Sequence, residues 1–329
     1  MILAGDIGGT KVNLACFEVE DRGLTCGVSG TYSSRDHASL EEIARLFITS
    51  QKLKVESACF GIAGPVRRGR AQLTNLSWTV DADELARGLG LKHVWLINDL
   101  EANAHGIAGL VPEDFVELNR GLDGAVGNLA VISAGTGLGE AGLLWDGHRH
   151  LVIPSEGGHA DFAPRTELDA ELLRHLQARL GQVSWENVLS GPGTVHIYEF
   201  LRDTGHGAAP DWLTAEFQRT DPPAAITRAA LDGKCALCVQ VLDLLVNYYG
   251  AEAANLALKM LATGGVYVGG GIAPKIISKL TDGSFMRAFI GRGRMKDLLA
   301  SMPVRVIMND KTALIGAARY AAVRSGKMV

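Results

Sequence analysis

Short glycine-rich segments that also carry a carboxylate or a hydroxyl are the most informative chemical feature of this sequence. Asp6-Ile-Gly-Gly-Thr10 follows strand-like residues 2–5 and precedes alternating apolar residues, so we expect it to form the turn of a hairpin. Backbone N–H groups in such a turn can converge on an anion, and the Asp6 carboxylate can serve a metal ion at the same place. The alternative is an ordinary hairpin, in which aspartate and glycine only satisfy turn geometry.

Two further glycine segments also fall where predicted strands end. Gly135-Thr-Gly-Leu-Gly139 follows the predicted strand 129–133, and the Thr136 hydroxyl can donate to a phosphate oxygen. The segment lacks the G-x-G-x-x-G spacing and leads into strand-like residues, which argues against a dinucleotide fingerprint. Gly269-Gly-Gly271 lies between a predicted strand at 266–268 and a predicted helix near Pro274. There the backbone can approach a flat ligand, or the strand can simply end.

Asn98-Asp99 comes directly after the predicted strand 93–97. Open α/β sheets bind ligands at the carboxyl ends of their strands. A carboxylate at that position can take a proton from a substrate hydroxyl while the hydroxyl oxygen attacks phosphorus. The alternative is that Asn98 or Asp99 caps the helix predicted at 99–107, with Glu101 in its first turn.

Glu156-Gly-Gly-His159 pairs a hydrogen-bond acceptor with a group that can donate or accept, and the glycines admit a ligand closely. Such a pair suits the hydroxyls of a polyol. A zinc site would need soft ligands, and the following residues 160–164 contain no cysteine. Glu186 stands two residues after Ser184 and can instead be a helix-start residue that Ser184 caps.

Composition limits the class of protein. The chain has 329 residues, enough for about two domains. Its formal net charge of -4 argues against a nucleic acid or an anionic membrane as the main partner. No apolar run reaches the ~20 residues of a membrane span, and no signal peptide is visible, so we expect a cytoplasmic protein. Cys235 and Cys238 form a lone pair without a nearby histidine, which favours a helix-face position over a metal site.

Strands and helices alternate over the first 110 residues, which predicts an α/β domain. Residues 109–128 have weak periodicity and mark a boundary. A second hairpin follows it, with strands at 129–133 and 143–145, and the residues after it are mainly helical. We expect a small domain at 1–110, completed by about 301–329 with a final helix at 312–323, and a large domain at 111–300.

In their order along the chain, these motifs resemble those of the bacterial-type glucokinases, group A within the actin and sugar-kinase superfamily. The resemblance runs through nearly the whole chain. The segments that carry it are residues 5–10, 73–78, 97–99, 135–139, 156–164, 189–193 and 264–272.

The resemblance implies a two-domain actin-like ATPase (ribonuclease H-like) fold. In this fold a ligand cleft lies between a small α/β domain and a larger α+β domain. It also implies ATP-dependent phosphorylation of D-glucose to glucose 6-phosphate, with ATP and Mg²⁺ as cofactors. Glucose and ATP would be the partners of a cytoplasmic homodimer without nucleic-acid or membrane partners.

The resemblance also implies roles for single residues. Asp99 would be the catalytic base, and Asp6 would lie near the magnesium ion, with no zinc bound. The substrate-binding residues would be Asn75, Asn98, Asp99, Glu156, His159 and Glu186. The ATP-binding residues would be Gly5, Asp6, Ile7, Gly8, Gly9, Thr10, Gly135, Thr136, Gly137, Gly269, Gly270 and Gly271. Many of the 40 glycines therefore fall in expected ligand loops.

Two departures from the family pattern and two alternative functions remain. Lys11-Val-Asn13 follows the first loop, as in the related repressor and sugar-kinase family that carries zinc, and Glu140 places a charge where an apolar residue is expected. The first alternative function is a kinase for another hexose or an amino sugar, such as mannose or an N-acetyl hexosamine. The second is a non-catalytic sugar sensor, for which we expect a DNA-binding extension that has no room before Gly5.

Overall fold

The computed structural model describes residues 1–20, 23–73 and 76–328. The chain divides into two compact units, Met1–Asp114 with Asn309–Val329, and Phe115–Met308. Each unit contains its own central sheet and its own hydrophobic core. The domain limits expected from the sequence, near residues 110 and 300, stay a prediction.

The first unit is built on a five-stranded sheet with the order β3-β2-β1-β4-β8. Its strands are β1 (Ile2–Ile7), β2 (Lys11–Glu20), β3 (Gly23–Ser33), β4 (Ser57–Ile62) and β8 (His93–Asn98). Strand β1 is antiparallel to β2 and parallel to β4, and β4 is parallel to β8. A small antiparallel sheet adds β5 (Val66–Arg67), β6 (Arg70–Gln72) and β7 (Thr79–Asp81).

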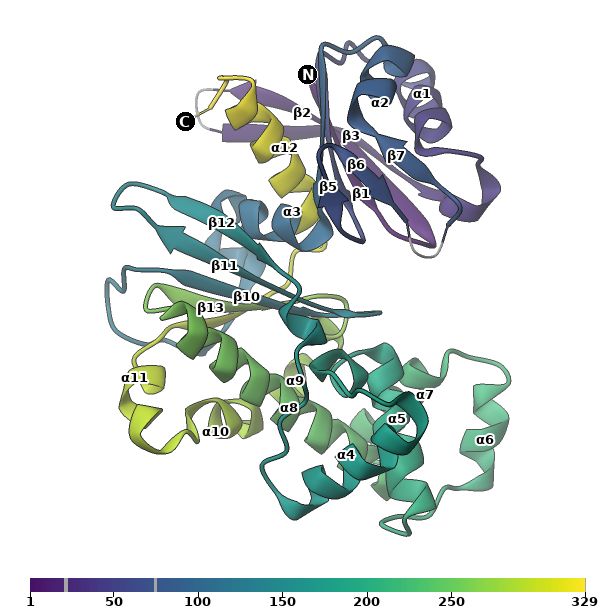
Figure 1. The fold of residues 1–329 in the computed structure, drawn as a ribbon, viewed down its shortest axis with the longest axis vertical. Helices are drawn as coiled ribbons and strands as arrows, with labels where there is room; N and C mark the ends of the chain where they lie inside the picture. Colours follow the sequence, from purple (N-terminus) through teal and green to yellow (C-terminus); the bar gives the residue numbers. More distant parts are fainter. Residues whose placement is uncertain (21–22, 74–75, 329) are drawn as a thin grey trace. The chain divides into compact units, whose positions relative to one another are not determined.

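Helices cover both faces of this five-stranded sheet (Figure 1). Alternate residues of β1 point to opposite faces, as the period of a strand requires. Leu3 and Ile7 join the core under α1 (Leu40–Ser50) and α2 (Ala82–Leu89). Ile2 and Ala4 join the core under α3 (Asp99–Gly106) and α12 (Thr312–Arg324). Of the three inner strands, β1 and β4 are buried along almost their whole length.

Helices α3 and α12 pack so closely that their backbones are in direct contact. A Cβ atom at Gly316 would collide with the carbonyl oxygen of Ala102, and one at Gly106 would collide with that of Thr312. On the sheet side, a Cβ at Gly61 would lie 2.9 Å from the Cβ of Ala102. Because α3 is held this closely on two sides, the position of its first residue, Asp99, is fixed.

The second unit is built on a six-stranded sheet with the order β12-β11-β10-β13-β14-β9. Its strands are β9 (Phe115–Asn119), β10 (Leu129–Ala134), β11 (Leu138–Trp145), β12 (His150–Ser155), β13 (Gly265–Gly269) and β14 (Val304–Ile307). Its helices are α4 (Glu167–Leu180), α5 (Gly191–Asp203), α6 (Asp211–Phe217), α7 (Pro222–Leu231), α8 (Ala236–Met260), α9 (Ile277–Leu280), α10 (Ser284–Ile290) and α11 (Lys296–Ala300). The long helix α8 is largely buried and supplies a large part of the core (Figure 1).

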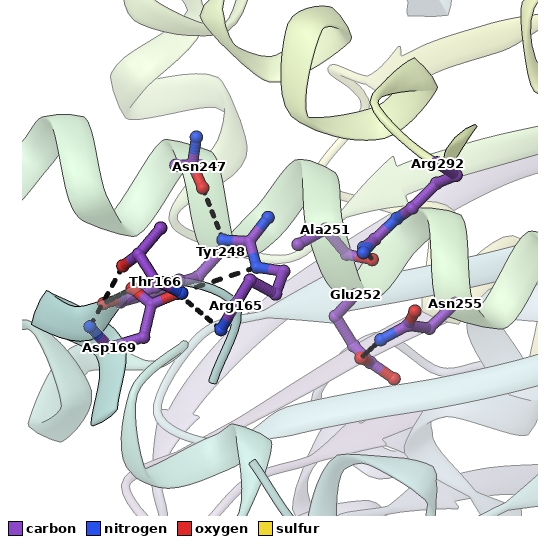
Figure 2. Close-up of polar contacts among 9 residues, drawn as sticks. All are labelled: Arg165, Thr166, Asp169, Asn247, Tyr248, Ala251, Glu252, Asn255 and Arg292. Carbon is purple, nitrogen blue, oxygen red and sulfur yellow. Dashed lines mark hydrogen bonds and ion pairs between the residues drawn. The ribbon is translucent and has the colours of Figure 1, made fainter. Parts of the chain in front are cut away.

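A buried carboxylate joins the start of α4 to the middle of α8. Asp169 accepts hydrogen bonds from the backbone N–H groups of Arg165 and Thr166 at 2.9 and 3.1 Å and from the Tyr248 hydroxyl at 2.9 Å. The Arg165 guanidinium donates to Asn247 one residue earlier on α8 (Figure 2). Every oxygen of this buried acid is thus partnered, as burial of a charge demands.

The structure corrects several expectations about single elements. Strand β9 lies within the expected boundary 109–128, and the edge strand β12 was not anticipated. Strand β11 begins at Leu138 and not at residue 143, so Leu138 and Gly139 belong to a strand and not to the expected turn. Strand β1 continues through Asp6 and Ile7, which were also expected in a turn. Edge strands are half-exposed, which weakens the apolar alternation that sequence reasoning depends on.

The cysteine pair lies on a helix, as expected. The Cys235 sulfur accepts a hydrogen bond from the backbone N–H of Cys238 at 3.4 Å at the start of α8, and both thiols are buried and free. Within the described ranges, no group of three or more histidine, cysteine or acidic residues could hold a metal ion. None of the helices in those same ranges combines the length and apolarity that a membrane span requires.

The contact between α3 and α12 yields a prediction. Gly316→Ala should destabilise the chain by about 1–3 kcal/mol, because the added methyl group forces two packed backbones apart. Gly27→Ala is the matched control, since a Cβ there meets only ordinary contact at 3.6 Å. Urea unfolding of both variants measures the effect. If Gly316→Ala unfolds at the same urea concentration as Gly27→Ala, the backbone contact does not hold α3.

Candidate active site

Three parallel strands of the first unit end at the same edge of their sheet. Ile7 of β1 pairs with Ile62 of β4, which pairs with Asn98 of β8. Asp6 and Asp99 therefore lie at the carboxyl edge, two strands apart. This is where open α/β sheets place their ligands.

Asn98 caps the helix that follows it, which is one of the two alternatives stated for Asn98 and Asp99. The Asn98 side-chain oxygen accepts from the backbone N–H groups of Leu100 at 2.9 Å and Glu101 at 3.3 Å, so Asn98 caps α3. Its amide nitrogen donates to the Gly64 carbonyl at 3.2 Å. Asp99 is half-buried in the first turn, and one of its carboxylate oxygens accepts from Leu100 N–H at 2.9 Å. A negative charge there is stabilised by the positive end of the helix.

Asp6 fits a magnesium site in its chemistry. Burial raises the pKa of the Asp6 carboxyl, and a hydrogen bond from the Asn13 amide at 3.3 Å lowers it in part. Asn13 is itself held by the Thr31 hydroxyl at 2.9 Å. A cation beside a desolvated carboxylate would favour its charged form. Mg²⁺ commonly takes only one or two protein carboxylates and completes its shell with phosphates and water.

The first glycine loop is held by its own backbone. Gly8 N–H donates to the Lys11 carbonyl at 2.9 Å, and the Ser34 hydroxyl donates to the Gly8 carbonyl at 2.9 Å. Thr10 is exposed beside it. Gly5 and Ile7, in contrast, are buried in the sheet, and a Cβ at Gly5 would collide with Phe60. Gly5 and Ile7 were expected to bind ATP. Because they are buried, they can contact a ligand only through backbone atoms, or affect its binding by supporting neighbouring residues.

The second glycine loop opens onto a cavity of about 860 Å³ within the second unit. Gly135, Thr136 and Gly271 line it together with residues of α5 and α7. The loop is closed by Gly135 N–H donating to the Gly137 carbonyl and by Gly191 N–H donating to the Gly135 carbonyl, each at 2.8 Å. A cavity of this volume is in the range of small-molecule sites.

Gly269 and Gly270 lie behind the cavity lining. The Gly269 carbonyl accepts from the buried Tyr249 hydroxyl at 2.6 Å. Gly270 has a φ of +83°, and a Cβ there would collide with the Ala134 carbonyl. Neither is among the described residues that line the cavity, so these two glycines serve the turn that presents Gly271.

Sequence reasoning missed the far wall of this cavity. The lining residues that it did not single out include His196, Asp221, Pro223, Thr227, Arg228 and Lys275. His196 is oriented by a 2.8 Å contact between its Nδ1 and the Asn187 carbonyl. The only signal was the segment 189–193, which was noted as a family motif without a role.

The Glu156–His159 turn lies close to Glu186. The segment that follows the turn and the segment that precedes Glu186 form backbone hydrogen bonds like those of paired strands. Trp185 N–H donates to the Ala160 carbonyl at 2.9 Å, and Phe162 N–H donates to the Val183 carbonyl at 2.9 Å. His159 Nδ1 then lies 4.0 Å from a carboxylate oxygen of Glu186. The three expected sugar ligands of this unit, Glu156, His159 and Glu186, retain solvent access.

Glu186 also touches the second glycine loop. Its other carboxylate oxygen accepts from Leu138 N–H at 2.9 Å, and a Cβ at Gly137 would lie 2.6 Å from that oxygen. The Glu186 carboxylate therefore lies between His159 of the Glu156–His159 turn and the second glycine loop.

Glu186 also lies in the first turn of the 3-10 helix Trp185–Asn187, directly after the N-cap residue Ser184, so the helix-start alternative is confirmed as its local position. That position alone does not account for the contact with Leu138. Asn75, the remaining expected sugar ligand, lies outside the described residues.

The cap of α3 yields a prediction. Asn98→Ala should destabilise the chain by about 1 kcal/mol, because it removes the acceptor for two N–H groups at the start of α3. Asn98→Ser keeps a capping oxygen and should recover most of this loss. Urea unfolding distinguishes the two variants. Equal stability of both variants would mean that the side-chain cap does not stabilise α3.

Comparison with known proteins agrees with this arrangement. The family model described as Glucokinase matches residues 3–324. The chain is 43% identical to a glucokinase of Nostoc punctiforme, over 98% of this chain and 99% of the relative, and 42% identical to one of Synechocystis sp., over 97% of each.

Solved structures show the same fold. A glucokinase from an Antarctic psychrotroph is 32% identical, covers 98% of both chains and superposes with a TM-score of 0.84. A ROK family glucokinase from Streptomyces griseus, solved with glucose and AMPPNP, is 23% identical with a TM-score of 0.64 and shows likeness of fold alone. The α/β architecture is the two-domain actin-like ATPase fold expected from the sequence. Since the match to the family model and to curated relatives extends over nearly its whole length, this chain belongs to the glucokinase family.

Proposed function

We propose that this chain transfers the γ-phosphoryl group of ATP to the 6-hydroxyl of D-glucose and releases glucose 6-phosphate and ADP. The observation that carries the proposal is the contact between Glu186 and the second glycine loop. There the Glu186 carboxylate, which can bind sugar hydroxyls, accepts a hydrogen bond from the loop whose backbone can bind phosphate. Membership of the glucokinase family supports the same reaction.

Asp99 is the general base in this proposal. The oxygen of the sugar 6-hydroxyl forms a bond to the γ-phosphorus while the bond from that phosphorus to the ADP oxygen breaks. The hydroxyl proton passes to the Asp99 carboxylate. Phosphoryl transfer asks for positioning and charge neutralisation more than for covalent chemistry, so a carboxylate fixed at the start of a helix suits the task.

The nucleotide would be held by residues of both glycine loops. The cavity bordered by Gly271 takes the adenosine. Because the N–H groups of Gly8 and Gly135 already donate within their own loops, phosphate oxygens are bound by the backbone N–H groups of residues 9–10 and 136–137. Asp6 would hold Mg²⁺, which when bound neutralises charge on the phosphates. The chain's own contribution is the desolvated carboxylate and the orientation that Asn13 gives it.

Sugar hydroxyls would be bound by Glu156, His159 and Glu186, with Asn75 and Asn98 as further ligands. The structure limits the role of Asn98. Its oxygen already accepts two helix N–H groups and its amide nitrogen already donates to the Gly64 carbonyl, so only the second amide hydrogen is left to donate to a sugar. We also propose a cytoplasmic homodimer, an assembly state that sedimentation of the purified chain would test.

A hexose panel tests the proposed substrate. With ATP and Mg²⁺, glucose should support ADP formation with a higher kcat/KM than mannose, fructose or N-acetylglucosamine. A coupled assay of ADP release measures each sugar. Preference for mannose or an amino sugar would favour the alternative hexose kinase, and sugar binding without turnover would favour the sensor.

Replacement of the base tests the proposed mechanism. Asp99→Asn should lower kcat at least ~10²-fold, since general-base catalysis contributes about that much, and should leave the KM for glucose within a few-fold. Asp83→Asn is the matched control, because Asp83 also lies in the first turn of a short capped helix, is exposed and has no proposed role. Near-wild-type kcat in Asp99→Asn would exclude Asp99 as the base.

A further inference from the structure

Two buried carboxyl groups lie close enough to interact, and one of them contacts the Glu156–His159 turn. Glu140 of β11 is 1% exposed and Glu252 of α8 is 0% exposed. Within the described residues, one oxygen of each carboxyl group, Oε1, has no hydrogen-bond donor. A pair of ionised carboxylates buried in this way is costly, but one shared proton turns the contact into a hydrogen bond.

The hydrogen-bond donor and the nearest positive group lie at Glu252, and the positive charge of Lys259 acts on Glu140 as well. The Asn255 amide donates to Glu252 at 2.6 Å (Figure 2), and the Lys259 ammonium lies 3.6 Å from its other oxygen. The Arg292 guanidinium donates to the Ala251 carbonyl. The negative charge of Glu252 raises the pKa of Arg292 in part, so the two groups attract each other. Burial raises the pKa of Glu252 as well, but Asn255 and Lys259 lower it in part, so the proton resides mainly on Glu140. Burial and the negative charge of Glu252 raise the pKa of Glu140 to about 8.

The Glu140 carboxyl supports the backbone of the turn. A Cβ at Gly157 would collide with Glu140 Oε2, and one at Gly158 would collide with the carbonyl oxygen of Leu138. Glu140 also pairs with Ser155 across β11 and β12, and the Ser155 hydroxyl accepts from Gly157 N–H at 2.8 Å. The Glu140 carboxyl therefore lies against Gly157, which stands between Glu156 and His159, and leaves no room for a side chain there.

We propose that Glu140 and Glu252 share one proton and that the protonated Glu140 is a positioning residue for sugar binding, holding the turn that carries Glu156 and His159. The part concerning sugar binding rests on the proposed function, whereas the shared proton does not. Loss of the proton places two negative charges side by side in the core. Their repulsion moves the Glu140 carboxyl and the turn that rests on it, so the chain binds glucose less tightly.

The pH dependence has a definite sign. The pKa of Glu140 is raised in the folded chain above its ordinary value of 4.5. The bound proton therefore stabilises the folded chain fully below about pH 4.5, and this contribution is lost as the pH rises through about 8. Sugar affinity should follow the same proton and fall above about pH 8.

Glucose kinetics of wild type and Glu140→Gln from pH 6.5 to 9.5 test the inference. The amide mimics the protonated acid and cannot ionise. The wild-type KM for glucose should rise up to about tenfold between pH 7 and pH 9, if the doubly ionised form does not bind sugar. The KM for ATP should change less. Glu140→Gln should keep a constant glucose KM over the same range.

Glu117→Gln is the matched control, because Glu117 is exposed on β9 at the opposite edge of the same sheet. It should show the wild-type pH profile. A glucose KM that rises equally in wild type and Glu140→Gln overturns the inference. So does a wild-type glucose KM that is the same at pH 7 and pH 9, a result that needs no variant to fold.

A thermal readout separates this inference from the proposed function. The Tm of Glu140→Gln relative to wild type should increase from pH 5 to pH 9, since only wild type loses a stabilising proton. This shift in a chain without glucose turnover would contradict the proposed function and keep the proton-sharing pair. Glucose turnover without this shift would contradict the pair and keep the proposed function.

Discussion

Helix α3 lies so close to its neighbours that only glycine fits at the contacts. Gly61 faces it from the sheet, and Gly316 faces it from α12, both at Ala102, one turn after Asp99. Tight contact on two sides leaves the helix little freedom to translate or rotate, because packed interiors do not deform continuously. Asn98 fixes the first turn by capping it. The proposed catalytic carboxylate is therefore placed by backbone contacts elsewhere in the same unit.

The second unit uses glycine for a related purpose. Gly137 leaves room for the Glu186 carboxylate and Gly157 leaves room for that of Glu140. Two acidic side chains thus lie directly beneath segments that we propose to bind phosphate and sugar. A methyl group at either glycine would meet a carboxylate, so part of the glycine content of these loops serves the protein's own packing and not only the approach of a ligand.

The sequence predicted those features that depend on local pattern. Strands buried on both faces, such as β10 and β13, were located to within one residue at each end, and the fold expected from the ordered motifs is confirmed. The edge strands β9 and β12 were missed because half-exposed strands alternate weakly. Glu140 was identified as a departure from the family pattern. Its partner, Glu252 on α8, is more than a hundred residues away in the chain. No local pattern can report such a pairing. The same holds for the cavity wall that α5 and α7 supply.

In the proposed reaction, one carboxylate, that of Asp99, takes the proton of one sugar hydroxyl. A crystal structure of the chain with bound glucose tests this assignment most directly. An oxygen of Asp99 should lie about 2.6–3.2 Å from the sugar 6-hydroxyl, the distance that proton abstraction requires. A bound glucose whose 6-hydroxyl faces away from Asp99, or one bound at other residues, would contradict it.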